Sequence, residues 1–371
     1  MSAQRPAITQ FQHYLALTGA GLSGLALLLS WGNDFALPLV AAFAAVGVIS
    51  LVRYGPGWSL WLDGALALFG ATALLLALGT LTPEPAAFWV ALAIVWVFAW
   101  LFVERLSGTI SAGRVPSELG VVVPLIFGGA ILLVWELVTR GAGIPTILLP
   151  PPSMIWGRIL SSLPMLAADF QQTFLKAVLI GYALGCGSGF LVAIAIDRSP
   201  FLKRGLLPLG NFVSALPIIG IAPIMVSWYG FDWQSKAAVV AVMTFFPMLV
   251  NTVAGLNASG SMERDMMRTY ASSYTQTLLK LRLPAAAPFI FNALKINSTL
   301  ALIGAIVAEF FGTPVVGMGF RISTEVGKMN VDLVWAEIAM AALAGSVFYG
   351  VVVLIERAVT FWHPSVRGGR A

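Results

Sequence analysis

The chain has 371 residues, of which 59% are hydrophobic and only 10% are charged. This composition exposes too much apolar surface for one water-soluble core, so a soluble globular protein is excluded and an integral membrane protein is predicted. The formal net charge of +5 is typical of basic anchors beside anionic lipid headgroups. Because neither a basic stripe nor a nucleic-acid motif accompanies it, we expect contact with membrane lipid and no nucleic-acid partner.

Apolar segments of membrane-spanning length recur along the chain. A helix of about 20 mainly apolar residues crosses roughly 30 Å of hydrocarbon, and these runs are apolar on every side, unlike the alternating segments of a barrel. The sequence therefore predicts an all-α integral membrane protein with about ten transmembrane helices. They are residues 11–31, 35–52, 59–81, 86–103, 119–139, 170–196, 208–228, 236–256, 289–311 and 333–357.

A polar segment at 104–118 divides these spans into blocks of four and six. We expect a four-helix accessory block at 1–104, a cytosolic linker at 105–118 and a six-helix core domain at 119–371. Lipid-facing packing and partner docking both stay open as roles for the accessory block.

The positions of the basic residues predict the orientation, because Lys and Arg beside membrane spans are retained on the cytoplasmic side. With both termini in the cytoplasm, 15 of the 21 Lys and Arg residues face the cytosol and 6 lie outside. The longest polar loop, residues 257–288, then faces the cytosol as well. The first span is too long for a typical signal-peptide core, so we expect it to remain uncleaved.

Small and cyclic residues mark two spans of the core domain. Gly181, Gly185 and Gly189 are spaced four apart, which aligns them on one helix face and indicates close packing against a neighbouring helix. Pro217 and Pro223 interrupt the hydrogen bonding of the span at 208–228. Such a kinked helix either lines an interior path or is simply bent, and both alternatives stay open.

Polar side chains inside apolar spans usually face the interior of a helix bundle. Asn251, Asn297 and Ser298 could hydrogen-bond a transported solute or a neighbouring helix. Glu309 lies near a span end and could also snorkel or pair. Together with Pro217 and Pro223, these four residues are the candidates for a translocation path.

The loop at 257–288 reads as a short helix, a turn at Ala271 and a second helix ended by Pro284. Such a hairpin presents a knob to a cleft on a protein partner. Met266, Met267, Tyr270 and Leu279 would form its apolar centre, surrounded by Arg264, Arg268, Lys280 and Arg282. The alternative is an amphipathic loop bound to lipid headgroups.

This loop resembles the cytoplasmic coupling motif of permeases in binding-protein-dependent ABC importers. The family pattern reads Glu-Ala-Ala, three residues, Gly, nine residues, Ile, one residue, Leu-Pro. The corresponding positions here are Asp265, Met266, Met267, Ala271, Leu281, Leu283 and Pro284. The acid, the aliphatic position and Leu-Pro agree, whereas both alanines are Met and the glycine is Ala.

The resemblance extends over about residues 119–365, through Leu149 to Pro152, Phe245 to Thr252 and Ala308-Glu309-Phe310. It is strongest to the nitrate, sulfonate and taurine branch, which includes permeases for pyrimidine-type precursors. The resemblance implies a six-helix type I importer core in a bacterial inner membrane. It also implies a second permease copy, two ATPase subunits and a periplasmic or lipid-anchored binding protein that delivers a small nitrate-, sulfonate- or taurine-like anion or a pyrimidine-type heterocycle.

No G-x-x-x-x-G-K-[ST] phosphate loop occurs, so ATP would bind a separate subunit and the chain is not expected to be an enzyme. The single Cys186 and the distant pair His13 and His363 predict no metal site, and no cofactor is expected. An ATP-independent secondary transporter or channel is the main alternative, but it would need ion-coupling acids deep in the membrane. A membrane-bound enzyme would need an acid–base pair facing one side, which we do not find in the sequence.

Overall fold

The computed structural model describes residues 9–29, 60–77, 86–113, 120–199, 201–202, 204–205, 217–312 and 315–362. All regular elements within these ranges are helices, which confirms the all-helical fold class. The chain divides into two compact units, Met1–Met154 and Ile155–Ala371, called unit 1 and unit 2. This division lies beyond the linker expected at 105–118, whose role as a functional boundary stays a prediction.

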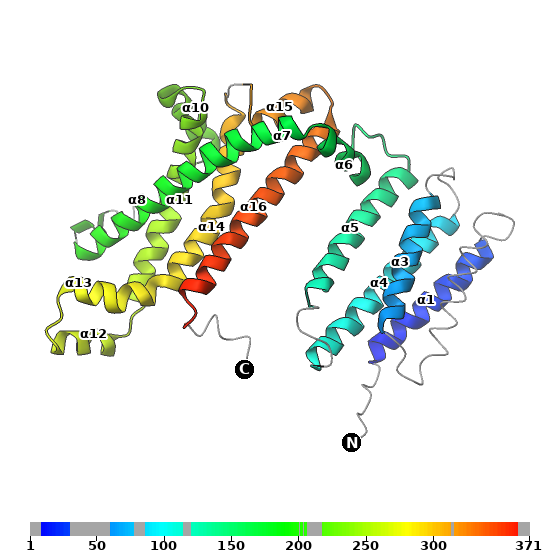
Figure 1. The fold of residues 1–371 in the computed structure, drawn as a ribbon, viewed down its shortest axis with the longest axis horizontal. Helices are drawn as coiled ribbons and strands as arrows, with labels where there is room; N and C mark the ends of the chain where they lie inside the picture. The colour runs from blue at the N-terminus through cyan, green and yellow to red at the C-terminus, as the bar shows by residue number, and fades with distance from the viewer. Residues whose placement is uncertain are drawn as a thin grey trace, which may run out of the picture. The chain divides into compact units, whose positions relative to one another are not determined.

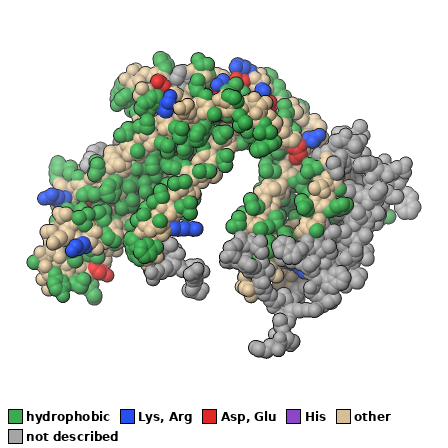
Figure 2. Space-filling model, in the orientation of Figure 1, with side chains coloured by type: hydrophobic (Ala, Val, Ile, Leu, Met, Phe, Trp, Pro, Cys, Tyr) green, Lys and Arg blue, Asp and Glu red, His purple; other side chains and the backbone are tan. Residues whose placement is uncertain are grey.

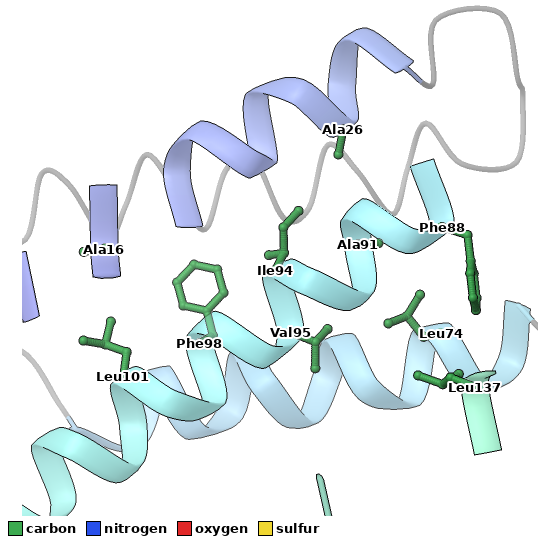
Figure 3. Close-up of a cluster of buried hydrophobic side chains, with 10 residues drawn as sticks. All are labelled: Ala16, Ala26, Leu74, Phe88, Ala91, Ile94, Val95, Phe98, Leu101 and Leu137. Carbon is green, nitrogen blue, oxygen red and sulfur yellow. The ribbon is translucent and has the colours of Figure 1, made fainter. Parts of the chain in front are cut away.

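The described part of unit 1 contains four long helices around an apolar core. They are α1 (Gln10–Leu29), α3 (Leu60–Ala77), α4 (Ala86–Ser111) and α5 (Val122–Gly141). Helix α4 packs against both α1 and α3 (Figure 1). Figure 3 shows its side chains Ile94 and Phe98, which are fully buried, as is Leu74 of α3. Since α4 is apolar around its circumference, it can bury two faces at once.

The described part of unit 2 is built on four long helical segments, Leu163–Arg198, Trp233–Asn257, Tyr274–Glu309 and Val331–Val359. Its elements are α6 (Pro152–Ser161), α7 (Leu163–Phe170), the π-helical turn η2 (Gln171–Val178), α8 (Leu179–Arg198), α10 (Ile218–Tyr229), α11 (Trp233–Asn257), α12 (Ser261–Thr269), α13 (Tyr274–Thr277), the π-helical turn η3 (Leu278–Arg282), α14 (Leu283–Glu309), α15 (Met318–Gly327) and α16 (Val331–Val359). Helices α12 and α13 lie at one end of the long helices, and α7, α10 and α15 lie at the other (Figure 1). We call these the α12 end and the α15 end.

Six helical stretches of the described residues are long and apolar enough to cross a membrane. They are Phe88–Ser111, Val122–Gly141, Leu163–Arg198, Trp233–Asn257, Tyr274–Glu309 and Val331–Val359, and each includes most of a span expected from the sequence. The surface of unit 2 is consistent with helices that cross a membrane. Figure 2 shows apolar side chains covering its long helices, with charged side chains gathered toward the two ends. A multi-pass membrane protein is thereby supported.

The remaining four expected spans have different outcomes. Those at 11–31 and 59–81 form α1 and α3, which are not among the six stretches, and the one at 35–52 lies outside the described residues. Of the span at 208–228, only residues 217–228 are described. They belong to α10, whose 12 residues extend about 18 Å, too short to cross the hydrocarbon alone. The number of ten therefore stays a prediction.

Gly181, Gly185 and Gly189 of α8 allow the backbone of α11 to approach closely, as predicted. A Cβ at Gly181 would lie 2.5 Å from the carbonyl oxygen of Ala237, and one at Gly189 would lie 2.5 Å from that of Phe245. At Gly185 the added carbon would overlap the Thr244 hydroxyl and the Ala241 backbone. The backbones are thus in contact along the crossing, in the manner of small-residue packing in membranes.

Two predictions about proline are wrong. Pro217 does not kink a helix: it has an extended ψ of 123° and lies at the N-cap of α10, leaving only Pro223 inside that helix. Pro284 does not end a helix either, because Tyr274–Glu309 forms one continuous helical stretch. The π-helical turn η3 comes directly before it, where the Leu283 N–H donates to the Leu278 carbonyl. This wider turn lets the chain pass a residue that lacks an N–H and would clash in a regular helix.

We expect Gly185→Ala to lower the thermal stability of the purified protein in detergent, because the new methyl group overlaps α11. Overpacking of this kind costs about 1–3 kcal/mol. Gly187→Ala is the matched control, since a Cβ there has no neighbouring heavy atom within 4 Å. Equal melting temperatures for the two variants would contradict the close α8–α11 contact.

Candidate functional site

The loop at 257–288 forms a hairpin of two helices joined by a tight turn. Helix α12 ends with the Ala271 N–H donating to the Arg268 carbonyl (2.9 Å) and the Ser272 N–H donating to the Met267 carbonyl (3.0 Å). Ala271 has a left-handed φ of 50°. This pair of hydrogen bonds is the Schellman motif, whose left-handed position favours glycine. The geometry gives a physical reason for glycine in the family pattern at this position.

The second helix of the hairpin has its own start signal. Ser273 accepts a hydrogen bond from the Gln276 N–H, while the Gln276 side chain accepts one from the Ser273 N–H. This capping box satisfies two backbone donors that the first turn of a helix leaves free. The hairpin is therefore specified locally at both sides of its turn.

An apolar stripe is exposed on this hairpin. Met262, Met266 and Tyr270 follow each other at intervals of four along α12, so they share one helix face. Their exposed fractions are 82%, 54% and 78%, and that of Leu279 in η3 is 59%. We call these four residues the α12 surface. Large apolar side chains exposed together beside charged ones are typical of a protein contact site.

The residues predicted for coupling are distributed over two places in the hairpin. Asp265 and Met266 are exposed on α12, and Asp265 pairs with Arg268 at 3.3 Å. Leu281, Leu283 and Pro284 are half-buried at the base of the second helix. Met267, predicted for the apolar centre, is also half-buried and contacts the Ser272 hydroxyl through its sulfur (3.9 Å).

A charged cluster anchors the base of the hairpin. The Arg282 guanidinium donates to both oxygens of Asp197, at 2.6 Å each, and its Nε donates to the Leu256 carbonyl at 3.0 Å. The Tyr274 hydroxyl donates to the same Asp197 carboxylate at 2.9 Å. Sequence reasoning placed Arg282 beside a partner and did not single out Asp197. The signal that could have identified Asp197 was the position of an acidic residue at the end of an apolar span.

Most polar candidates for a translocation path make contacts between or within helices. The Asn297 amide is fully buried and donates to the Thr244 carbonyl (2.8 Å) and to the Cys186 sulfur (3.2 Å). Ser298, also fully buried, donates to the Lys295 carbonyl of its own helix. Asn251 is half-buried, donates to the Pro247 carbonyl and accepts from the exposed Asn292 at 3.5 Å.

Glu309 belongs to a buried network at the α15 end. Three successive backbone N–H groups at the start of α15 donate to side chains of other segments. Gly317 donates to Asp169 (2.6 Å), Met318 to the Thr173 hydroxyl (2.8 Å), and Gly319 to Glu309 (2.6 Å). The Thr173 hydroxyl in turn donates to Glu309 at 2.7 Å. These side chains satisfy the free donors of a helix N-terminus, which also favours negative charge.

Charged groups surround this network. Arg321 pairs with Asp169 at 2.9 Å, and this hydrogen bond raises the pKa of the guanidinium above its ordinary value. The Lys236 ammonium is buried and donates to the Phe231 carbonyl at 2.6 Å. Sequence analysis missed Asp169, Thr173 and Arg321. The spacing of Asp169 and Thr173, four residues apart on one helix face, was the signal that could have found two of them.

We expect Asp169→Asn to lower the free energy of unfolding by about 3–5 kcal/mol, because Arg321 would lose its partner in a buried site. The measurement is the melting temperature in detergent. Asp265→Asn is the control for stability, since its ion pair is largely exposed, with side-chain exposures of 83% and 68%, and such pairs contribute about 0–1 kcal/mol. Equal losses in the two variants would show that Asp169 has no special structural role.

The chain is similar to known transport proteins. Residues 181–361 match the family described as binding-protein-dependent transport system inner membrane component. The chain is 29% identical over 240 residues to the formylaminopyrimidine transport permease protein of Halalkalibacterium halodurans. The aligned region covers 65% of this chain and 95% of that protein.

Two further relatives are transport permease proteins of other bacteria. The chain is 27% identical over 248 residues to the aliphatic sulfonates transport permease protein of Bacillus subtilis, covering 66% and 88% of the two chains. It is 26% identical over 243 residues to the taurine transport system permease protein of Escherichia coli, covering 64% and 88%. With these matches, residues 181–361 form a domain of the binding-protein-dependent transport family, and the protein is the permease subunit of an ABC importer, a membrane subunit that is not an enzyme.

Proposed function

We propose that the α12 surface is the site at which an ATPase subunit binds this permease. The observation that carries the proposal is the exposed apolar stripe of Met262, Met266 and Tyr270 at the α12 end. A stripe at intervals of four is the arrangement with which a helix enters an apolar groove on a partner. The exposed Arg268 and Lys280 would surround this contact with charge.

The importer then contains two permease copies, two ATPase subunits and an external substrate-binding protein, periplasmic or lipid-anchored. Membership of the importer family supports the ATPase and the binding protein. The pairing of two permease copies, as a homodimer, is part of our proposal. Closure of the two ATPases would displace both α12 hairpins and open the core helices alternately to the two sides of the membrane.

In this arrangement the α12 end faces the cytosol and the α15 end faces outward, in a bacterial inner membrane. The distribution of Lys and Arg supports this orientation and places both termini in the cytoplasm. A topology of ten spans, divided into four and six at residues 105–118, agrees with this orientation. The accessory block at 1–104 would then precede the type I core.

We keep the residues expected from the sequence as candidates for the translocation path. Their burial and hydrogen bonds support different roles. Asn297 and Glu309 are buried and bonded to other segments, which supports a role in holding helices together, whereas the buried Ser298 donates within its own helix. Asn251, with the exposed Asn292, is the polar group among them that is accessible to a solute. Pro217 and Pro223 flank and interrupt α10 and are exposed.

The solute is, on this proposal, a small sulfonate-like or taurine-like anion or a pyrimidine-type heterocycle. The transport permeases of formylaminopyrimidine, aliphatic sulfonates and taurine to which the chain is similar support both classes. An ATP-independent transporter or channel is the alternative function. It would leave the α12 surface without a partner, so we favour the importer.

We expect Met266→Glu to reduce binding of the ATPase subunit at least tenfold, because the carboxylate would have to be desolvated within an apolar contact. Affinity purification of the complex through the permease measures the bound ATPase. Thr275→Glu adds the same charge to the exposed surface of α13 and should leave binding close to that of the wild type. Undiminished ATPase recovery with Met266→Glu would refute docking at the α12 surface.

Substitutions of Ala271 separate the shape of the turn from its chemistry. The left-handed φ of 50° at this position costs a non-glycine residue about 1–2 kcal/mol. We therefore expect Ala271→Gly to stabilise the hairpin and preserve ATPase binding, whereas the β-branched side chain of Ala271→Val should weaken binding. If the valine variant recovered as much ATPase as the glycine variant, the turn would not determine the docking surface.

A further inference from the structure

The helix that carries the hairpin into the membrane is irregular at its base. Between Leu278 and Pro284 the hydrogen bonding changes from the π-helical pattern of η3 to that of α14. Pro284 has no N–H to contribute, so this segment has fewer backbone bonds than a regular helix. A displacement applied to α12 would bend the chain here unless another contact held it.

Arg282, the last residue of η3, makes that contact. Its guanidinium forms a two-pronged ion pair with Asp197 near the end of α8, with both distances at 2.6 Å. Its Nε donates at 3.0 Å to the carbonyl of Leu256 near the end of α11. One side chain therefore joins α8, α11 and the start of α14.

The surroundings stabilise this arrangement. The Asp197 and Arg282 side chains are only 8% and 13% exposed, so water screens their attraction less than that of a surface pair. Tyr274, in the second helix of the hairpin, donates to Asp197 at 2.9 Å, and the Arg198 guanidinium lies 5.8 Å from the Tyr274 ring centroid. Leu256 of α11, Leu278 of η3 and Ala286 of α14 form a buried apolar cluster, and Ile194 of α8 packs against it.

We propose that Arg282 and Asp197 form a clamp that makes α8 and α11 move with the hairpin. The clamp rests on the proposed function, in which an ATPase displaces α12. Because the ion pair crosses the irregular segment, the displacement reaches three helices together and does not dissipate as bending at η3. Arg282 and Asp197 are thus positioning residues: they touch neither ATP nor solute. Arginine suits this geometry because its Nε, Nη1 and Nη2 reach the Leu256 carbonyl and the two carboxylate oxygens from separate atoms, whereas a lysine would have to reach all three acceptors from its single Nζ.

The test follows movement at the far end of the helix that contains Asp197. Leu163 begins the continuous stretch Leu163–Arg198 at the α15 end and is 47% exposed. With the native Cys186 replaced by Ser, Leu163→Cys supplies the single thiol of each permease chain, whose labelling is followed in the permease–ATPase complex in lipid nanodiscs. Its labelling rate with a polar maleimide is compared without nucleotide and after trapping with MgATP and vanadate, so no transported solute is needed.

We expect trapping to change the labelling rate several-fold in this background. Arg282→Lys and Asp197→Asn should reduce that change at least threefold while ATPase binding and ATP hydrolysis are retained. Glu356→Gln is the matched control, because Glu356 forms a comparably enclosed ion pair with Lys295, with side-chain exposures of 15% and 22%, outside the hairpin. It should keep the full change.

The outcomes distinguish the clamp from the proposed function. If Met266→Glu abolishes ATPase binding but the clamp variants keep the full labelling change, docking stands and the clamp is refuted. If the clamp variants lose ATPase binding as Met266→Glu does, the ion pair shapes the docking surface and transmits nothing, which also refutes the clamp. If Met266→Glu binds ATPase normally, the proposed docking site itself is wrong.

Discussion

The close contact of α11 with α8 on one side and α14 on the other is the constraint on which unit 2 depends. Gly181, Gly185 and Gly189 bring the α8 backbone against α11, and Gly255 does the same where α11 meets Ala286 and Phe289 of α14. In hydrocarbon, lipid chains are as apolar as leucine, so helices associate through close packing and polar contacts and not through exclusion of water. Backbone contact at these glycines therefore determines how the helix ends are placed.

With the helix ends placed in this way, clusters of charged and polar side chains lie at the two ends of the bundle. At the α15 end, Asp169, Thr173 and Glu309 bind the first N–H groups of α15. At the α12 end, Asp197 and Arg282 join three segments. This separation follows from the cost of leaving a charge unpaired in a medium without water. The same clusters connect α15 and the hairpin to the long helices, which would have to move during transport.

Both π-helical turns in the described residues of unit 2, η2 and η3, carry side chains that make these long-range contacts. In η2, Gln172 donates to Asp232 and Thr173 donates to Glu309, each at 2.7 Å. In η3, Arg282 binds Asp197. A π-helical turn rotates the residues that follow it relative to a regular helix and is frequent at functional sites. Each turn thus directs polar side chains toward a neighbouring segment while the helix continues on the same course.

Composition and local pattern alone determined the helical membrane fold, six of the spans, the glycine packing face and the hairpin with its turn at Ala271, because each depends on residues close together in the chain. Only the tertiary structure decided that the helix continues through Pro284, and that Arg282 pairs with Asp197 and Thr173 with Glu309. These partners lie 85 and 136 residues apart. Their meeting depends on which helix ends the packing of α8, α11 and α14 brings together, and no local pattern contains that information.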